Sequence, residues 1–371
     1  MRTDVIARLR KAMAAAGLDA LVAISPENFA YATGFVVPSQ PLMRWRHAIC
    51  AVTADGRTGV VCVDMEETTV RGRLPDQDIR VWGEFTDRPM DALARLLMDM
   101  GAGEGRIGIE FNYLPAGDYE QIGALLPDAR FEPADALFDR MRQIKTADEI
   151  ALLRRLSRIS DTAIAESFRA VTAGKTEMDM AGALTRSVYA QGAEQFKLMI
   201  VATGERSELP NVGPTMRVLK DGDICRVEIF SIIGGYHAGV CRTAAVTRVR
   251  PEAARIWANL VECKYLVLDM IRPGASARAI YEAFLGKFGE LGLPPISFVG
   301  HGIGLHLHEE PYLGKYRDYE IEAGMVLGIE PLVYRTGMGF GLQLKDMVAV
   351  TETGAELLSD VTDTDTLFPI Q

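Results

Sequence analysis

The sequence predicts an α/β domain with a mixed sheet, followed by an α+β domain. In the first part of the chain, short apolar runs alternate with amphipathic helical segments, which is the pattern of helices packed on a sheet. Thr146 and Glu149 then form a Thr-x-x-Glu capping box, which predicts the start of a long helix and a domain boundary just before it. With 371 residues the chain is long enough for two domains, which we expect at 1–140 and 141–371.

The elements of the first domain follow from the spacing of its apolar residues. Residues 4–17 predict an amphipathic helix because Val5, Leu9 and Met13 recur on one helical face. Short apolar runs bounded by turn residues predict strands at 19–24, 48–52, 59–63, 79–82 and 106–111. Further helices are expected at 88–100 and 115–125.

The second domain begins with the capped helix, which we expect to run from 146 to about 171. Gly234 and Gly235 predict the turn of a hairpin between two of the strands that follow. The expected strands are 196–202, 225–233, 236–248, 325–334 and 342–351. The other expected helices are 176–191, 251–271 and 276–291.

The composition excludes several classes of function. A formal net charge of −10 argues against nucleic acid and anionic membranes as partners. The five cysteines are odd in number and lack Cys-x-x-Cys spacing, which is typical of reduced thiols in the cytoplasm. No uncharged run fits a signal peptide or a membrane span. We therefore expect a cytoplasmic protein whose partner is neither nucleic acid nor a membrane.

The segment from Gly300 to Pro311 concentrates residues that carry chemistry. It contains His301, His306 and His308, which are three of the five histidines in the chain. Glycines alternate with its first residues and allow the backbone to approach a ligand closely. Histidine changes its protonation near neutral pH, so this cluster predicts proton transfer or metal ligation.

A series of short motifs follows in order along nearly the whole chain. They include Ser25-Pro-Glu-Asn28, Ile144-Lys145, Gly222-Asp223, Gly235-Tyr236, Arg242-Thr243, Gly300-His-Gly-Ile-Gly304, His308-Glu309-x-Pro311 and Ile329-Glu-Pro331. In this order the motifs resemble the creatinase, prolidase and aminopeptidase P superfamily. The resemblance implies a creatinase-like N-terminal domain and a C-terminal catalytic domain with the pita-bread fold.

The resemblance also implies where a metal site would lie. The metallopeptidases of this family hold two divalent ions with side chains whose positions fall here on Glu228, Gly239, His301, Glu330 and Lys345. The hairpin is expected to bring Glu228 almost opposite Gly239, which has no side chain, and protonated Lys345 can only donate. We therefore expect no dinuclear site and no cofactor. The alternative is a single divalent metal on Glu228, His301 and Glu330.

The charges of the same residues suggest what the site binds. Glu228 and Glu330 supply two negative charges, and Lys345 supplies one positive charge. A second positive charge would balance the site. We expect it to come from a cationic substrate group or from a protonated His301.

Creatinase, the metal-free member of the family, is similar to this sequence at His301, His308 and Glu330. It differs at Asn211, Cys241 and Lys345. In dimeric family members the loop that corresponds to 38–47 reaches the active site of the neighbouring subunit. This loop carries Arg44 and Arg46, either of which is suited to bind a substrate carboxylate. The resemblance therefore also implies a homodimer.

From these observations we predict a metal-independent, creatinase-like hydrolase of a C–N bond in a small carboxylate-bearing substrate that contains a guanidino, amidino or amide group. The expected catalytic residues are His301, His308, Glu330 and Lys345. The expected substrate-binding residues are Glu228, Arg44, Arg46, His237, Cys241 and Asn211. One alternative is a mononuclear metal-dependent Xaa-Pro dipeptidase or aminopeptidase-like enzyme. The other is a non-catalytic homologue that binds a ligand.

Overall fold

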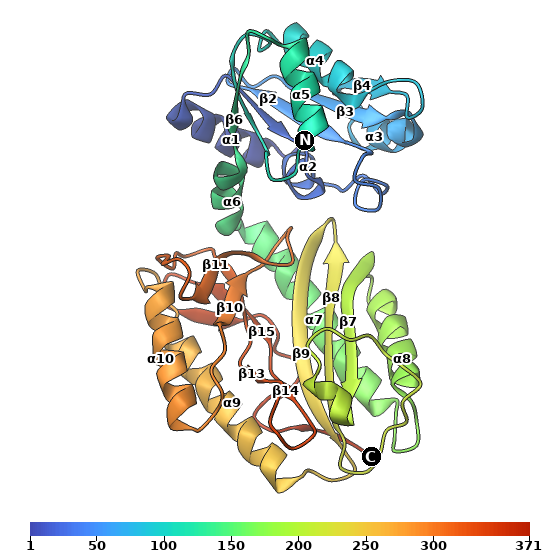
Figure 1. Cartoon of the computed structure of the whole chain (residues 1–371), viewed down its shortest axis with the longest axis vertical. Helices are drawn as coiled ribbons and strands as arrows, with labels where there is room; N and C mark the ends of the chain where they lie inside the picture. The colour runs from blue at the N-terminus through green and yellow to red at the C-terminus, as the bar shows by residue number, and fades with distance from the viewer. The chain divides into compact units, whose positions relative to one another are not determined.

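The computed structural model describes residues 1–371, which form two compact units, Met1–Arg142 and Gln143–Gln371. Figure 1 shows the elements of each unit. The first unit is an α/β domain and the second is an α+β domain, so the predicted fold class is confirmed.

The first unit contains a six-stranded mixed sheet in the order β4-β3-β2-β1-β5-β6. Strand β1 pairs antiparallel with β2 and parallel with β5. The strands are β1 (Ala20–Ala23), β2 (Ile49–Thr53), β3 (Thr58–Val63), β4 (Asp78–Trp82), β5 (Arg106–Ile109) and β6 (Arg130–Pro133). The helices are α1 (Thr3–Ala16), α2 (Pro26–Thr33), α3 (Glu67–Arg73), α4 (Pro89–Asp99), α5 (Ala116–Leu125) and α6 (Asp135–Gln143), with a 3-10 turn η1 (Asp64–Glu66). The apolar faces of β1, β3 and α4 share one core.

The second unit opens with α7 (Ala147–Arg169). Thr146 accepts a hydrogen bond from the backbone N–H of Glu149, whose side chain accepts from Thr146 in return, so the predicted capping box is confirmed. The other helices are α8 (Glu177–Ala190), α9 (Pro251–Met270) and α10 (Ala277–Glu290), with a 3-10 turn η2 (Gly204–Glu208). In Figure 1, α7 and α8 lie against β7 to β9, and α9 and α10 lie beside the strands that follow them.

The strands of this unit form three sheets. Their orders are β17-β9-β8-β7, β11-β10-β12-β15-β16 and β13-β14. The strands are β7 (Gln195–Thr203), β8 (Ile224–Ile233), β9 (Tyr236–Val246), β10 (Phe298–Gly302), β11 (Glu309–Gly314), β12 (Val326–Ile329), β13 (Leu332–Val333), β14 (Leu342–Gln343), β15 (Asp346–Val350), β16 (Ala355–Leu357) and β17 (Phe368–Ile370). Apolar residues of α9, α10, β12 and β15 form the core between them.

The two strands predicted at 325–334 and 342–351 are each interrupted in the structure. The first breaks between β12 and β13 at Glu330 and Pro331, and the second breaks between β14 and β15 at Leu344 and Lys345. Proline has no N–H to donate to a ladder, which accounts for the first break. Glu330 and Lys345 therefore lie outside regular strands, so their side chains need not follow the alternation between the two faces of a sheet.

The hairpin of β8 and β9 turns at Gly234 and Gly235, as predicted, but its register differs from the expectation. Ile233 pairs with Tyr236, and this tight turn aligns Glu228 with Cys241 rather than with Gly239. Gly239 pairs instead with Phe230. Because side chains alternate between the two faces of a strand, Glu228, Phe230, Gly239 and Cys241 still share one face.

Candidate active site

His301 lies on β10 and is completely buried. Its Nδ1 donates to the carbonyl oxygen of Gly302 at 2.7 Å, which leaves Nε2 as the nitrogen that faces the other charged residues. The glycines around it are required by close backbone approach. A Cβ on Gly302 would lie 2.4 Å from the carbonyl oxygen of Glu310, and one on Gly300 would lie 2.7 Å from that of Gly328.

Lys345 brings its ammonium group into the centre of the site. Its Nζ lies 3.3 Å from Oε1 of Glu228 and 3.2 Å from Oε2 of Glu330. It also lies 3.1 Å from Nε2 of His301. Burial acts to lower the pKa of Lys345, but the two carboxylates outweigh it and the pKa is raised. Lys345 is therefore a buried, charged ammonium.

The two carboxylates are held from the other side by Gln343, which is not among the predicted site residues. Its Nε2 donates to Oε2 of Glu228 and to Oε2 of Glu330, at 3.2 Å in each case. Glu330 also lies close to His301, with Oε1 and Nε2 3.3 Å apart. Burial acts to raise the pKa of Glu330, but Lys345 and His301 lower it below its ordinary value. Glu330 is therefore ionised.

Strands from two sheets meet at this centre. Glu228 comes from β8, whereas His301 lies on β10 and Glu330 follows β12. Cys241 on β9 and Lys345 form an isolated antiparallel bridge through their backbones, with N···O distances of 3.3 and 3.1 Å. This bridge fixes the Lys345 backbone against the sheet that carries Glu228.

Arg242 reinforces the bridge. It belongs to the Arg242-Thr243 motif, but the sequence did not indicate this role. Its guanidinium pairs with both oxygens of Asp161 and with Asp346, and its Nη1 donates to the carbonyl oxygen of Lys345 at 2.7 Å. Arg242 and both aspartates are buried. Arg242 therefore fixes the position from which the Lys345 side chain starts.

His308 covers one side of the centre. Its ring stacks on that of His301, with centroids 3.7 Å apart and planes 14° from parallel. Burial of much of the ring, followed by the electrostatic influence of the neighbouring His301 and Lys345, lowers the pKa of His308 to about 3. Part of the residue remains exposed to solvent. His308 is therefore a neutral hydrogen-bonding group at neutral pH.

Phe230 fills the space beside Gly239. An ideal Cβ on Gly239 would lie 2.1 Å from Cε1 of Phe230, so the ring lies where a side chain at 239 would begin. The same ring faces Lys345, whose Nζ is 4.7 Å from the ring centroid. The Phe230 ring can therefore occupy this position only because residue 239 has no side chain.

Three other residues that were predicted to bind the substrate make no direct contact with the ammonium group. His237 is buried, donates through Nδ1 to the carbonyl oxygen of Gly304 at 3.3 Å, and has its pKa lowered by burial to about 4. The Cys241 thiol donates to the carbonyl oxygen of Gln343 at 3.7 Å, and burial raises its pKa well above the usual range. Asn211 lies on the segment between η2 and β8.

Arg44 and Arg46 belong to the first unit and are engaged there. Arg46 makes a bidentate pair with Glu84, at 2.7 Å for each contact. Arg44 donates to the carbonyl oxygen of Tyr113 at 2.8 Å and lies over its ring.

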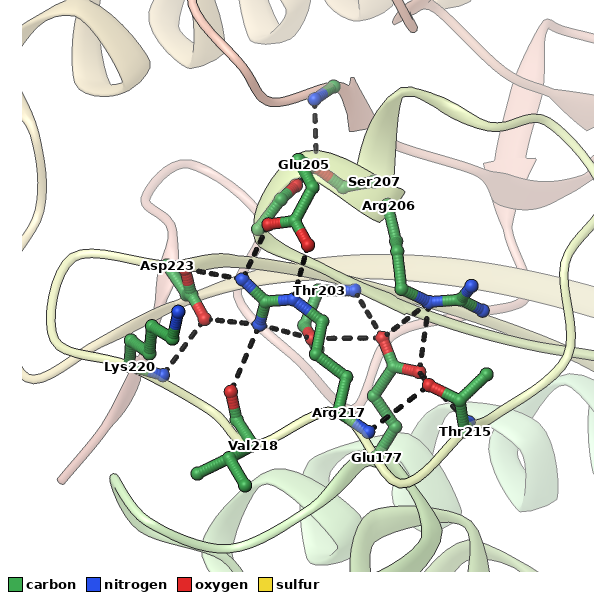
Figure 2. A network of polar contacts seen from close by, with 12 residues as sticks. Glu177, Thr203, Glu205, Arg206, Ser207, Thr215, Arg217, Val218, Lys220 and Asp223 are labelled. Carbon is green, nitrogen blue, oxygen red and sulfur yellow. Dashed lines mark hydrogen bonds and ion pairs between the residues drawn. The ribbon is translucent and has the colours of Figure 1, made fainter.

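The segment that joins β7 to β8 is held in place by a polar network around Glu177 (Figure 2). Glu177 is fully buried and accepts hydrogen bonds from Thr203, Arg206 and Thr215. Arg217 extends the network by pairing with Glu205 and Asp223 (Figure 2). These interactions fix both ends of the segment 204–217.

Comparison with known proteins identifies the family. Residues 151–352 match the model of metallopeptidase family M24, and residues 6–144 match the creatinase/prolidase N-terminal domain. The chain belongs to metallopeptidase family M24. It is 33% identical over 219 residues to a probable dipeptidase PepE of Mycobacterium tuberculosis, and this match spans 58% of each protein. An Xaa-Pro dipeptidase of Pyrococcus furiosus is 28% identical over 62% of this M24 chain and 66% of its own length.

Solved structures agree with this assignment of the M24 chain. The dipeptidase PepE from Mycobacterium ulcerans superposes with a TM-score of 0.85 at 25% identity, over 99% of this chain and 97% of that one. An Xaa-Pro dipeptidase from Bacillus anthracis has a TM-score of 0.85 at 24% identity, over 99% of both chains, which shows the same fold. None of the helices is long and apolar enough to cross a membrane.

Family membership corrects the predicted function. A peptidase family supports the coarser prediction of a hydrolase that acts on C–N bonds. It contradicts the prediction of a metal-independent, creatinase-like hydrolase of guanidino or amidino substrates, because the relatives are dipeptidases and Xaa-Pro dipeptidases of a metallopeptidase family. It likewise contradicts the expectation that no metal cofactor is used. The Xaa-Pro dipeptidase alternative agrees better with the relatives.

The residues that the structure brings together nevertheless do not fit a divalent ion. The ammonium group of Lys345, which has no lone pair, already lies among Glu228, Glu330 and His301. Phe230 fills the place beside Gly239 where another ligand would start. No group of three His, Cys, Asp or Glu side chains in the structure is arranged to hold a metal.

Proposed function

We propose that the chain hydrolyses the peptide bond of short peptides, and that dipeptides with proline in the second position are among its substrates. The names of its relatives support this class of substrate. The observation that carries the proposal is the buried ammonium of Lys345, held between two carboxylates next to a stacked histidine pair. A fixed positive charge in a water-poor site is suited to the charge that develops during attack on an amide.

Lys345 has the central electrostatic role in this proposal. When water adds to the carbonyl carbon of the substrate, negative charge collects on the carbonyl oxygen. The Lys345 ammonium would stabilise that charge, and it needs little reorganisation because Glu228 and Glu330 already fix its position. The carboxylates thereby act through Lys345 and also keep it protonated.

His301 is the proposed proton carrier. Because its Nδ1 donates to Gly302, a neutral ring has its lone pair on Nε2. The imidazolium formed when Nε2 takes a proton from the attacking water would be stabilised by Oε1 of Glu330, 3.3 Å away, until the proton passes to the leaving nitrogen. His308, with a pKa of about 3, is a poor proton donor near neutral pH. We assign it a hydrogen bond to the substrate.

The remaining predicted contacts stay proposals. Cys241 shares a strand face with Gly239, His237 lies on the same strand, and Asn211 lies on the segment before β8. Arg44 keeps part of its surface exposed, so it is a better candidate for a carboxylate than Arg46, whose guanidinium is paired with Glu84. The domain boundary at 140, the cytoplasmic location and the homodimer also remain predictions.

The proposal is tested by incubating the purified protein with a panel of dipeptides and measuring the release of free proline and other amino acids. The panel is run with and without added Mn²⁺, so that a requirement for the ion is read directly. Lys345→Ala and His301→Ala should abolish the release, whereas Lys287→Met, which changes a surface pair with Glu262, should leave it unchanged. Release that survives both alanine replacements would refute the assigned roles.

A second candidate is a non-catalytic homologue that binds a small ligand. The complete pairing of Lys345 within a buried centre favours it, because its ammonium group already has two carboxylate partners. Saturable stabilisation of the protein by a dipeptide that is not hydrolysed, in the presence or absence of Mn²⁺, would favour this candidate over the peptidase.

A further inference from the structure

Arg226 is a buried cation whose charge no carboxylate of the chain balances by direct contact. It lies on β8, two residues before Glu228, and is completely buried. Its Nη2 donates to the carbonyl oxygens of Leu209 and Pro210, and its guanidinium lies over the ring of Tyr334. Its Nε has no hydrogen-bond partner. A buried guanidinium without an ion pair is costly, so its position calls for an explanation.

The remaining hydrogen bond of Arg226 leads into the active centre. Its Nη1 donates to Oε1 of Gln343 at 2.9 Å. Arginine has no acceptor, so the amide oxygen of Gln343 must face it. The amide nitrogen then faces the opposite way, where it reaches the carboxylates of Glu228 and Glu330. Since carboxylates only accept, one orientation of the amide satisfies all three of these neighbours.

Arg226 also completes the charge of the centre. Glu228 and Glu330 carry two negative charges, and Lys345 carries one positive charge among them. The predicted sources of the second positive charge were the substrate and His301. Arg226 supplies it within the chain, one side chain removed from the carboxylates.

We propose that Arg226 is a positioning residue, which acts through Gln343 to hold Glu228 and Glu330 at the distances that place the Lys345 ammonium. The proposal rests on the proposed peptidase function. It implies that the substrate need not bring a positive charge of its own. An uncharged peptide carbonyl can then be the group that contacts Lys345.

The competing explanation is that Arg226 only anchors the segment 204–217 through the two carbonyl oxygens it binds. Arg206 provides a matched control for that role. Its guanidinium pairs with Glu177 (Figure 2) and donates to the carbonyl oxygen of Gly213 at 2.7 Å. It therefore holds the same segment through contacts that do not include Gln343. Arg206→Met loosens the segment and leaves the relay from Arg226 through Gln343 to the carboxylates intact.

The experiment compares kcat and KM for dipeptide hydrolysis in Arg226→Met, Arg226→Lys, Gln343→Leu, the Arg226→Met/Gln343→Leu double variant and Arg206→Met. Arg226→Met and Gln343→Leu should each lower kcat by about 10²-fold with little change in KM, as expected for misplaced catalytic groups. The double variant should be no worse than either single variant, because both interrupt the same relay. Arg226→Lys should recover part of the loss, and Arg206→Met should stay near the wild type.

Three results would overturn the inference. They are an unchanged kcat in Arg226→Met, an equal loss in Arg206→Met, or losses that multiply in the double variant. If Arg226→Met fails to fold, the comparison of kcat between Gln343→Leu and Arg206→Met tests the inference instead. If the wild type hydrolyses no dipeptide, the peptidase proposal fails by itself. The relay is then tested by guanidinium unfolding, where midpoint shifts of the two single variants that simply add would refute it.

Discussion

Replacing Lys345 with methionine tests whether its ammonium group holds the centre together. Methionine has a similar length and no charge, so Lys345→Met leaves the carboxylates of Glu228 and Glu330 facing each other with only Gln343 between them. The substitution removes the ion pairs of 3.3 and 3.2 Å from Nζ to the two carboxylates. Removing one partner of a buried ion pair costs about 3–5 kcal/mol. We expect a decrease of this size in the free energy of unfolding at pH 7.

This decrease should become smaller as the pH falls. In the wild type, Lys345 keeps the pKa of Glu330 below its ordinary 4.5, so the stability that this pair contributes is present above 4.5 and disappears as the pH falls towards about 2. In the variant no ammonium lowers this pKa, so burial, which acts to raise it, is opposed mainly by His301. Glu330 then takes up a proton earlier, which relieves its repulsion with Glu228. The difference between the two proteins is therefore largest near neutral pH.

The assay is guanidinium unfolding at pH 7 and near pH 4.5. Hydrogen exchange in β8 and β9 is measured as well, so that the stability of the second unit is determined separately from that of the first. Lys287→Met is the matched control, since it removes a lysine from an exposed pair with Glu262 and should change little. A Lys345→Met protein as stable as the wild type at pH 7 would refute the reasoning. An equal decrease at both pH values would show that Glu330 is not the ionised partner.

Three other predictions concern the same centre. Gly239→Asp alone should destabilise the protein by about 1–3 kcal/mol, because its Cβ would lie 2.1 Å from the ring of Phe230; adding Phe230→Ala should recover part of this stability in thermal unfolding. Lys345→Glu should tighten Mn²⁺ binding at least about tenfold in calorimetry, because it exchanges a positive charge for a carboxylate beside Glu228. His308→Gln should change the hydrolysis rate by the same factor across about pH 5–8, since a pKa of about 3 leaves His308 neutral throughout; a pH limb that disappears in this variant would contradict the assignment.

Features that depend on neighbouring residues could be predicted from the sequence. The capping box at Thr146 and Glu149 and the turn at Gly234 and Gly235 are both in the structure, because each is determined by a few consecutive residues. The grouping of His301 with the acidic residues was also expected, but through the resemblance of the motifs rather than through periodicity.

The residues that the sequence did not reveal act across strand interruptions and between sheets. Gln343 precedes the break between β14 and β15, where the alternation of faces no longer says which way a side chain points. Arg226 occupies a largely apolar strand, and a lone arginine there does not indicate its partner. The register of β8 and β9 differs from the predicted one by two residues, since only the hydrogen-bonded turn fixes which residues pair.

The unusual residues of the centre compensate for one another physically. Buried carboxylates at Glu228 and Glu330 without a positive partner would cost several kcal/mol each, so a site that had merely lost its ligands would be unstable or would replace them. Here an ammonium group lies between the carboxylates, the ring of Phe230 fills the space beside Gly239, and Arg226 supplies the second positive charge through Gln343. Random loss of a function gives no reason for Arg226 to be buried at such cost next to an amide that it orients. The arrangement therefore favours a centre that still acts on or binds a ligand, and the kinetics of Arg226→Met against Arg206→Met distinguish that from a purely structural network.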